Sequence, residues 1–322
     1  MPLGGMDRRS LIAAMLALPG VARAQSVAPP DPTEVIHLWP DGAPGGEGVT
    51  VMPVVVERST DPSFHDRYAQ YTTDPILTVV RPERPNGASM LLIPGGGYRW
   101  AVIDKEGLDV ARVFAAAGVT CYVLRYRLPA DGWTAGPDAP LQDAQRALRL
   151  VRSAAIAEGR DPSKVAVLGA SAGGHLAAML TARHDVTYPP VDASDAQSHR
   201  PDLAILLYPV VTMQDPLVHA GSRAQLLGAS PSEVLTARYS MQMADWTGAP
   251  PVFLLHAADD AAVPLGNSLQ LWMSLKTAGV PSEIHVFEEG GHGFGIRLIA
   301  GKPAAVWPSL ALAWAARHGW PG

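Results

Sequence analysis

The chain has 322 residues, of which 48% are hydrophobic and 17% are charged, and its formal net charge is −5. This composition is typical of a globular protein, and the negative charge argues against a basic surface for nucleic acid. Its single cysteine, Cys121, excludes an intrachain disulfide framework and a cysteine-based zinc site, and no apolar run beyond the N-terminus approaches the roughly 20 residues of a membrane span.

Residues 1–24 have the pattern of a signal peptide. The pair Arg8-Arg9 is followed by the apolar run 11–18, and Ala22-Arg23-Ala24 is an A-x-A cleavage site. The pattern predicts export, so that the mature chain begins near residue 25 and acts in the periplasm or outside the cell. The arginine pair resembles a twin-arginine signal, although Asp7 before it departs from that pattern, so the export route stays open. The alternative is an N-terminal helix that frays.

Strand-like and helix-like segments alternate along the rest of the chain. Residues 25–50 are rich in proline and glycine and predict an irregular arm, and residues 185–201 predict a polar loop. Predicted strands cover 51–57, 76–81, 89–93, 119–126, 165–168, 203–208, 252–256 and 283–287. Predicted helices cover 105–118, 141–158, 172–180, 265–278 and 303–318. This order predicts a single α/β domain, 25–322, with a mostly parallel, doubly wound sheet.

Residues 211–247 interrupt this alternation between two predicted core strands. The segment is too long for a simple crossover. It contains Ser230-Pro231-Ser232-Glu233, a helix-capping pattern with proline at the first helical position. We therefore expect a small helical cap beside a site at the carboxyl ends of the strands.

The run Gly169 to Gly173, GASAG, lies between a predicted strand and a predicted helix. A G-x-S-x-G box in this context indicates a nucleophile elbow, a sharp turn that presents Ser171 above the sheet. The alternative is a loop of small residues without chemistry. A serine hydroxyl needs a base and an orienting carboxylate. In proteins whose serine stands on a nucleophile elbow, these residues follow along the chain in the order serine, acid, histidine.

Both partners occur in that order. Asp259 and Asp260 follow the strand at 252–256, and His292 follows the strand at 283–287 in a glycine-rich loop. Because neighbouring side chains diverge, only one aspartate can face His292. For the histidine, the alternative is a turn residue without a role.

An oxyanion hole needs N–H donors near the serine. We expect the amide of Ala172, at a helix N-terminus, and those of Gly96 and Gly97 in Pro94-Gly95-Gly96-Gly97-Tyr98. The alternative is that the glycine run forms a tight turn and does not bind an oxyanion.

Tyr98 and Trp100 flank the expected hole. They are candidates for an aromatic wall against a sugar ring, and packing beneath the cap is the alternative. His175 is expected to be a buried structural histidine, and Asp143 to tie its helix to a loop. No histidine cluster suggests a metal site, and the proposed chemistry needs no cofactor.

Taken together, the triad segments, the PGGGY loop, Leu38 to Gly45 (LWPDGAPG) and Pro140 to Arg146 (PLQDAQR) resemble the bacterial acetylxylan-esterase-like enzymes of the α/β-hydrolase superfamily, over about Leu38 to Phe294. The resemblance implies an α/β-hydrolase fold and removal of acetyl groups from plant polysaccharides or oligosaccharides. The D-x-x-V-P pattern of related hydrolases favours Asp260 over Asp259 as the acid. Where the general lipase pattern has a histidine before the glycines, this chain has Pro94.

Two other functions remain as alternatives. A peptidase of the prolyl-oligopeptidase type shares the fold, although no propeller domain precedes the catalytic segments here. A binding protein that has lost catalysis is the non-enzyme alternative, but such proteins usually lack a member of the triad.

Overall fold

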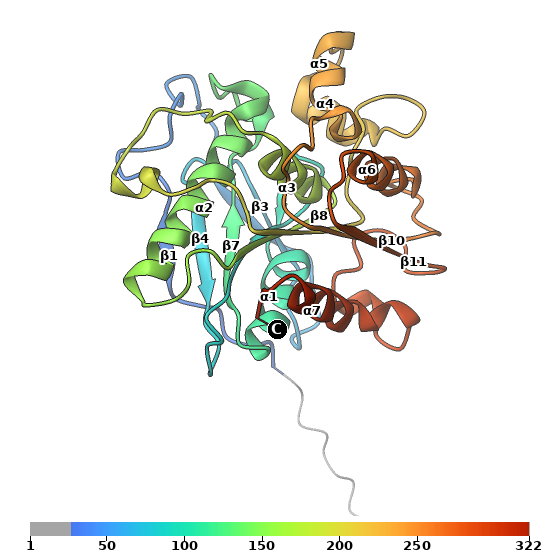
Figure 1. Ribbon diagram of the computed structural model, residues 1–322. Coiled ribbons are helices and arrows are strands. Elements are labelled where there is room, and N and C mark those ends of the chain that lie inside the picture. The colour runs from blue at the N-terminus through green and yellow to red at the C-terminus, as the bar shows by residue number, and fades with distance from the viewer. Residues whose placement is uncertain (1–26, 322) are drawn as a thin grey trace, which may run out of the picture.

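The computed structural model describes residues 27–321 and contains an eight-stranded sheet (Figure 1). In spatial order the strands are β1 (Val35–His37), β4 (Ile76–Val80), β7 (Thr120–Arg125), β5 (Ser89–Ile93), β8 (Val165–Ala170), β9 (Leu203–Leu207), β10 (Val252–Ala257) and β11 (Ser282–Phe287). The neighbours from β7 to β11 are parallel, and β4 is antiparallel to both β1 and β7. The predicted mostly parallel sheet is confirmed.

Helices cover both faces of this sheet, as the alternating order predicts. One face carries α2 (Ala139–Ala157), α3 (Ala172–Ala182) and α6 (Gly266–Thr277), and the other carries α1 (Asp109–Ala116) and α7 (Trp307–Arg317) (Figure 1). A π-helical turn, Asp104–Leu108, precedes α1. Short 3₁₀ turns complete the connections: Pro129–Asp131, Gly136–Asp138, Ala193–Ala196, Met241–Met243, Arg297–Ile299 and Pro303–Val306.

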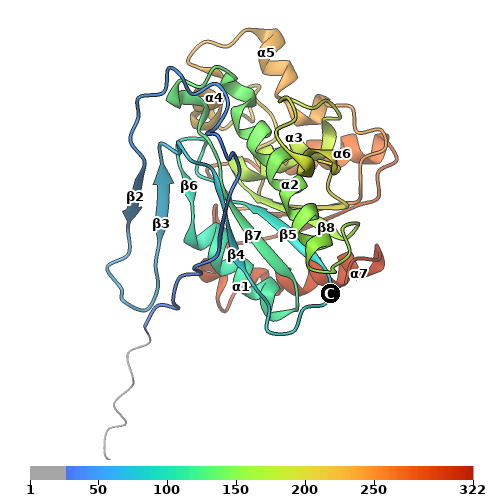
Figure 2. The ribbon, with the colours of Figure 1, turned by 90° about the vertical axis from the view of Figure 1, so that its left-hand side faces the viewer.

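A second, three-stranded sheet stands beside the first (Figure 2). It consists of β2 (Val54–Glu57), β3 (Arg67–Gln70) and β6 (Ala101–Val102), paired antiparallel. A strand therefore forms within the predicted range 51–57, but it belongs to the small sheet and not to the main sheet. β3 and β6 were not predicted, and neither was β1 inside the expected irregular arm. Strands of two to four residues are too short to show a clear alternation.

The segment 185–201, predicted as a loop, contains one short 3₁₀ turn and covers α2. Arginines three positions apart in α2 pair with two aspartates of this segment and with the aspartate that precedes β9. The pairs are Arg146–Asp192, Arg149–Asp195 and Arg152–Asp202. The polar character of the segment thus reflects ion pairing with a buried helix rather than full solvation.

The segment 211–247 forms two short helices, α4 (Ala220–Leu227) and α5 (Glu233–Arg238), above one end of the sheet (Figure 1). The N-cap of α5 is Ser232, whose hydroxyl accepts the Leu235 N–H at 3.2 Å. The helix therefore begins two residues later than the capping pattern at Ser230 predicts.

Candidate active site

The turn from β8 to α3 holds Ser171 in a strained backbone conformation, with φ +54° and ψ −121°. The two flanking glycines are required by packing. A Cβ on Gly169 would meet the Gly173 carbonyl, and one on Gly173 would meet the carbonyl of Ile93. The serine side chain therefore stands at the carboxyl end of a central strand, at the N-terminus of a helix.

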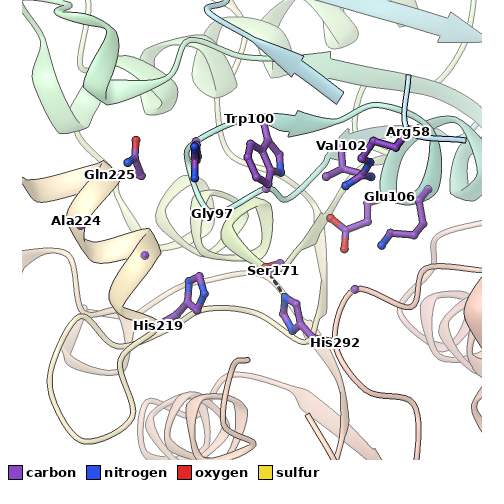
Figure 3. A pocket seen from close by; sticks show the side chains of 15 residues that line it. Arg58, Gly97, Trp100, Val102, Glu106, Ser171, His219, Ala224, Gln225 and His292 are labelled. Carbon is purple, nitrogen blue, oxygen red and sulfur yellow. Dashed lines mark hydrogen bonds between the residues drawn. The ribbon is translucent and has the colours of Figure 1, made fainter. Parts of the chain in front are cut away.

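Three side chains from separate loops form a hydrogen-bonded chain. Ser171 Oγ lies 2.8 Å from His292 Nε2 (Figure 3), and His292 Nδ1 lies 2.7 Å from Asp260 Oδ2. A carboxylate accepts only, so Nδ1 carries the proton and donates it, which leaves Nε2 free to accept from the serine hydroxyl. This is the arrangement in which an imidazole can act as a base toward serine.

The surroundings of Asp260 keep its carboxylate charged. Burial alone would raise the pKa of Asp260, but hydrogen bonds from His256 and His292 and the Val263 amide outweigh it and hold the pKa well below its usual range. Its Oδ1 accepts the N–H groups of Ala262 and Val263 at 2.9 and 2.8 Å.

The neighbouring Asp259 points elsewhere. Its Oδ1 accepts the N–H of Gly291 at 2.7 Å, next to the histidine. Of the two aspartates, only Asp260 contacts the imidazole, while Asp259 fastens the loop that carries His292.

The glycine loop after β5 lies against Ser171. Gly96 and Gly97 have φ values of +131° and +64°, which favour glycine. Within residues 27–321 no acceptor is bonded to the N–H of either residue, whereas the N–H of Gly95 donates to Glu106 Oε2 at 2.9 Å. Ala172 is the first residue of α3, so no preceding helical turn accepts its N–H. These three amides are the ones expected to serve as donors.

Tyr98 does not contribute an aromatic wall, and that prediction is wrong. Its side chain is fully buried, and its hydroxyl lies 2.7 Å from His175 Nδ1. His175 Nε2 in turn lies 2.7 Å from the carbonyl oxygen of Tyr239, and burial lowers the pKa of His175 to about 4. The neutral imidazole therefore donates to the carbonyl and accepts from Tyr98, in the structural role expected of it. Trp100, by contrast, lines the cavity in front of Ser171.

Asp143 also has the tying role expected of it. It accepts from Trp39 Nε1 at 2.8 Å and from the backbone N–H of Arg127 at 2.7 Å. The helix α2 is thereby joined to the N-terminal arm and to the loop after β7.

A cavity of about 420 Å³ opens above the serine. In the view of Figure 3, Arg58 and Glu106 lie on one side of Ser171 and Gln225 of α4 lies on the other. The lining residues are Arg58, Gly96, Gly97, Arg99, Trp100, Val102, Lys105, Glu106, Ser171, His219, Gly221, Ala224, Gln225, His292 and Gly293.

Several of these lining residues have no local signal in the sequence. Arg58 comes from the edge strand region of the small sheet, and Lys105 and Glu106 come from the π-helical turn, neither of which has a recognisable motif.

His219 was also missed by the sequence analysis. It is the N-cap of α4, and its Nδ1 accepts the Ser222 N–H at 3.1 Å. Burial lowers the pKa of His219, and the nearby His292 lowers it further. Its Cε1 lies 3.8 Å from where a Cβ on Gly97 would stand, so this neutral ring abuts the glycine loop.

Glu106 and Tyr208 support the loops behind the cavity. Glu106 is only 3% exposed and accepts from Gly95, as described above. The hydroxyl of Tyr208 accepts the Gly295 N–H at 3.1 Å, and the Tyr208 ring lies 5.2 Å from the His292 ring, edge to face. Burial, with the nearby charge of Glu106, raises the pKa of Tyr208 well above its usual value.

Within residues 27–321, no three His, Cys, Asp or Glu side chains gather as ligands of a metal ion would. None of the helices described is long and apolar enough to cross a membrane. The signal-peptide prediction falls on residues 1–24, outside the part of the chain that the structure describes.

Comparison with known proteins gives a consistent picture. Residues 90–296 match the family described as the alpha/beta hydrolase fold. The chain is 31% identical over 218 residues to an acetylxylan esterase of Xylanibacter ruminicola, covering 66% of this chain and 42% of that protein. It is 33% identical over 210 residues to endo-1,4-beta-xylanase B of Butyrivibrio fibrisolvens, covering 63% of this chain and 32% of that protein. The chain therefore spans less than half the length of either relative.

Among solved structures, an acetyl ester-xyloside bifunctional hydrolase from Caldicellulosiruptor lactoaceticus superposes with a TM-score of 0.72 at 30% identity, covering 93% of this chain and all of that one. An esterase of Thermogutta terrifontis, at 24% identity and a TM-score of 0.63, covers 87% of this chain and 98% of that one and shares the fold.

Proposed function

This chain belongs to the α/β-hydrolase fold family, and from that premise we propose that it is a serine ester hydrolase that removes acetyl or other short acyl groups from carbohydrate. The observation that carries the proposal is the hydrogen-bonded chain of Ser171, His292 and Asp260, with distances of 2.8 and 2.7 Å at the mouth of one cavity.

The reaction would proceed through an acyl-enzyme. His292 Nε2 takes the proton of Ser171 as its oxygen attacks the ester carbonyl, and the buried carboxylate of Asp260 stabilises the resulting imidazolium. His292 then protonates the departing alcohol. In the second half, the same nitrogen activates a water molecule that releases the acid and restores the serine.

The developing oxyanion would be bound by the amides of Ala172, Gly96 and Gly97. Removal of one such donor in a serine hydrolase costs about 2.7–4 kcal/mol of transition-state stabilisation. The positive end of α3 adds a favourable potential at the same point.

For the substrate, we propose acetylated xylan or another acetylated plant oligosaccharide. The names of the relatives support this: one is an acetylxylan esterase, another a xylanase, and a structural neighbour acts on acetyl esters and xylosides. Trp100 at the cavity supplies an aromatic face suited to the C–H face of a sugar ring.

The segment 211–247 is proposed to act as the cap over this cavity. Its helix α4 supplies Gly221, Ala224 and Gln225 to the lining, and His219 lies at the N-terminus of that helix. A cap in this position would restrict which alcohol groups reach the serine.

We further propose that the protein is exported, with residues 1–24 removed. The support is the pattern of the arginine pair, the apolar run and the A-x-A site. Mass spectrometry of the protein recovered from periplasmic and medium fractions tests this. An intact residue 1–24 segment on protein confined to the cell interior would contradict it.

The enzymatic proposal is tested by release of acetate from acetylated xylo-oligosaccharides, followed by mass spectrometry, with 4-nitrophenyl acetate as a simple ester. The wild-type protein should cleave both, and Ser171→Ala should cleave neither above background. Cleavage of proline-linked amides without any esterase activity would instead favour a peptidase, and inactivity on all of these substrates would favour a binding protein.

A further inference from the structure

One wall of the cavity is a stack of two cations and two aromatic rings. The guanidinium carbon of Arg58 lies 5.4 Å from the ring centroid of Tyr68, and that ring lies 4.9 Å from the ring of Trp100. The guanidinium carbon of Arg99 lies 5.1 Å from the ring centroid of Trp100, the second aromatic residue of the stack. The small sheet supplies Arg58 and Tyr68, and the glycine loop supplies the other two. Cation–π contacts of this kind hold a guanidinium in a defined place.

Two of the cations that line the cavity have no carboxylate partner. Arg58 pairs with Asp66 at 2.9 Å. For Arg99 and Lys105, by contrast, no carboxylate within residues 27–321 lies at ion-pair distance, although both side chains face the cavity that contains Ser171. Most other arginines of the described chain are ion-paired, as Arg67 is with Asp104 at 2.8 Å. Arg99 and Lys105 are therefore two unpaired cations within one cavity lining.

The single carboxylate in the cavity lining, Glu106, forms no ion pair with Arg99 or Lys105 within 4.0 Å. Glu106 is 3% exposed and is engaged by the N–H of Gly95. Arg58 is paired with Asp66, which leaves Arg99 and Lys105 against this one carboxylate, in a chain whose net charge is −5. A positive cleft on a negative protein raises the local concentration of anionic ligands.

We infer that the cavity takes esters whose carbohydrate carries a carboxylate, that is, acylated oligosaccharides with a uronic acid next to the ester. The inference rests on the proposed esterase function and names its substrate class. The planar fork of Arg99 can bind a carboxylate through two parallel hydrogen bonds, and Lys105 adds a second positive charge. We assign the carboxylate to the sugar rather than to the acyl group, because Arg99 lies beside Trp100, the aromatic residue of the cavity lining that is proposed to border the sugar site.

The test compares acetylated xylo-oligosaccharides that differ only in a glucuronic acid branch. We expect kcat/KM for the acidic substrate to exceed that for the neutral one by about fivefold or more at low salt, the ratio that one exposed ion pair of about 1 kcal/mol supplies. The ratio should fall toward one in about 0.5 M NaCl, where exposed charges are screened.

Variants assign the effect to residues. Arg99→Gln and Lys105→Gln should each lower the ratio of the two kcat/KM values, and Arg99→Lys should retain part of it. Arg84→Gln is the matched control, because Arg84 is an exposed arginine that has no ion-pair partner among residues 27–321 and lies outside the cavity. The Arg84→Gln protein should have the same ratio of kcat/KM for the acidic and the neutral substrate as the wild-type protein.

A second pair of substrates locates the carboxylate. 4-Nitrophenyl hemisuccinate and 4-nitrophenyl butyrate have acyl groups of four carbons that differ by a terminal carboxylate in place of a methyl group, and we expect no preference for the hemisuccinate. A preference there would overturn the assignment to the sugar. If the wild-type protein cleaves acidic and neutral oligosaccharides equally, the inference is wrong while the esterase function stands. If it cleaves no ester at all, the proposed function itself has failed.

Discussion

The adjacent aspartates Asp259 and Asp260 provide a matched pair for testing how the histidine is oriented. In Asp260→Asn, the side-chain oxygen can still accept the N–H groups of Ala262 and Val263, so the new NH₂ group takes the position of Oδ2. That position lies 2.7 Å from His292 Nδ1. An amide NH₂ donates, so the imidazole must accept through Nδ1 and carry its proton on Nε2. His292 can then no longer take the proton of the serine.

The size of the effect follows from this change of tautomer. In serine hydrolases, placing the wrong tautomer at the base lowers kcat by about 10⁴-fold, or about 5.5 kcal/mol. We expect a loss of that order for Asp260→Asn with 4-nitrophenyl acetate. The free energy of unfolding should fall by less than this. The hydrogen bonds from the N–H groups of Ala262 and Val263 are kept, and the one to His292 is formed again with donor and acceptor exchanged.

Asp259→Asn is the control. Its Oδ1 accepts the Gly291 N–H, and an asparagine oxygen can accept the same hydrogen bond. We expect its activity to stay within about threefold of wild type, since the hydrogen bond to Gly291 is kept and only the charge of an exposed side chain is lost. Steady-state kinetics of both variants, with thermal unfolding to establish that they fold, is the assay. Equal activity of the two variants, or a larger loss in Asp259→Asn, would refute the reasoning.

Three further predictions concern the scaffold around the serine. Gly173→Ala should destabilise the protein by about 1–3 kcal/mol or prevent its folding, because the new Cβ meets the Ile93 carbonyl, and a Tm equal to wild type would contradict this. Tyr98→Phe should lower the free energy of unfolding by about 1–3 kcal/mol by leaving buried His175 Nδ1 unpaired, as urea unfolding can measure; an unchanged midpoint and slope would argue against that hydrogen bond. The pKa of His175 is about 4 in the folded state against 6.5 unfolded, so the unfolded chain binds the extra proton and stability is lost as pH falls from about 6.5 toward 4. Between pH 6.5 and 5 this residue should remove about 2 kcal/mol, and a His175→Gln variant whose stability falls just as steeply over that window would refute the assignment.

Much of the main sheet could be predicted, because buried parallel strands are continuous apolar runs with clear ends. The runs that became β5, β8 and β9 are fully buried, and their predicted bounds differ from the observed ones by no more than two residues. The small sheet could not be predicted in the same way. The side chains of β2 are largely exposed, and β6 has two residues, so neither leaves a periodic signal.

In the candidate site, the three triad residues could be predicted from the sequence and most of the cavity lining could not. Ser171, Asp260 and His292 lie at places where a motif or chain order limits the choice, and the structure brings all three together. Tyr98 and Trp100 are separated by a single residue, yet one is buried and the other lines the cavity. The sequence could not distinguish them, because the positive φ of +59° at Tyr98 redirects its side chain.

The cations of the cavity wall had no sequence signal at all. Arg58 and Arg99 are 41 positions apart, and only the three-stranded sheet brings Arg58 to the glycine loop. Long-range pairing of short edge strands is the step that local patterns do not encode.

The central claim is that the oxygen of Ser171 becomes acylated. A fluorophosphonate probe, followed by proteolysis and peptide mass mapping, tests it directly. We expect a single adduct on the peptide that contains Ser171, with labelling lost in Ser171→Ala and strongly slowed in His292→Ala. Labelling of another serine, or ester hydrolysis by Ser171→Ala at the wild-type rate, would contradict it.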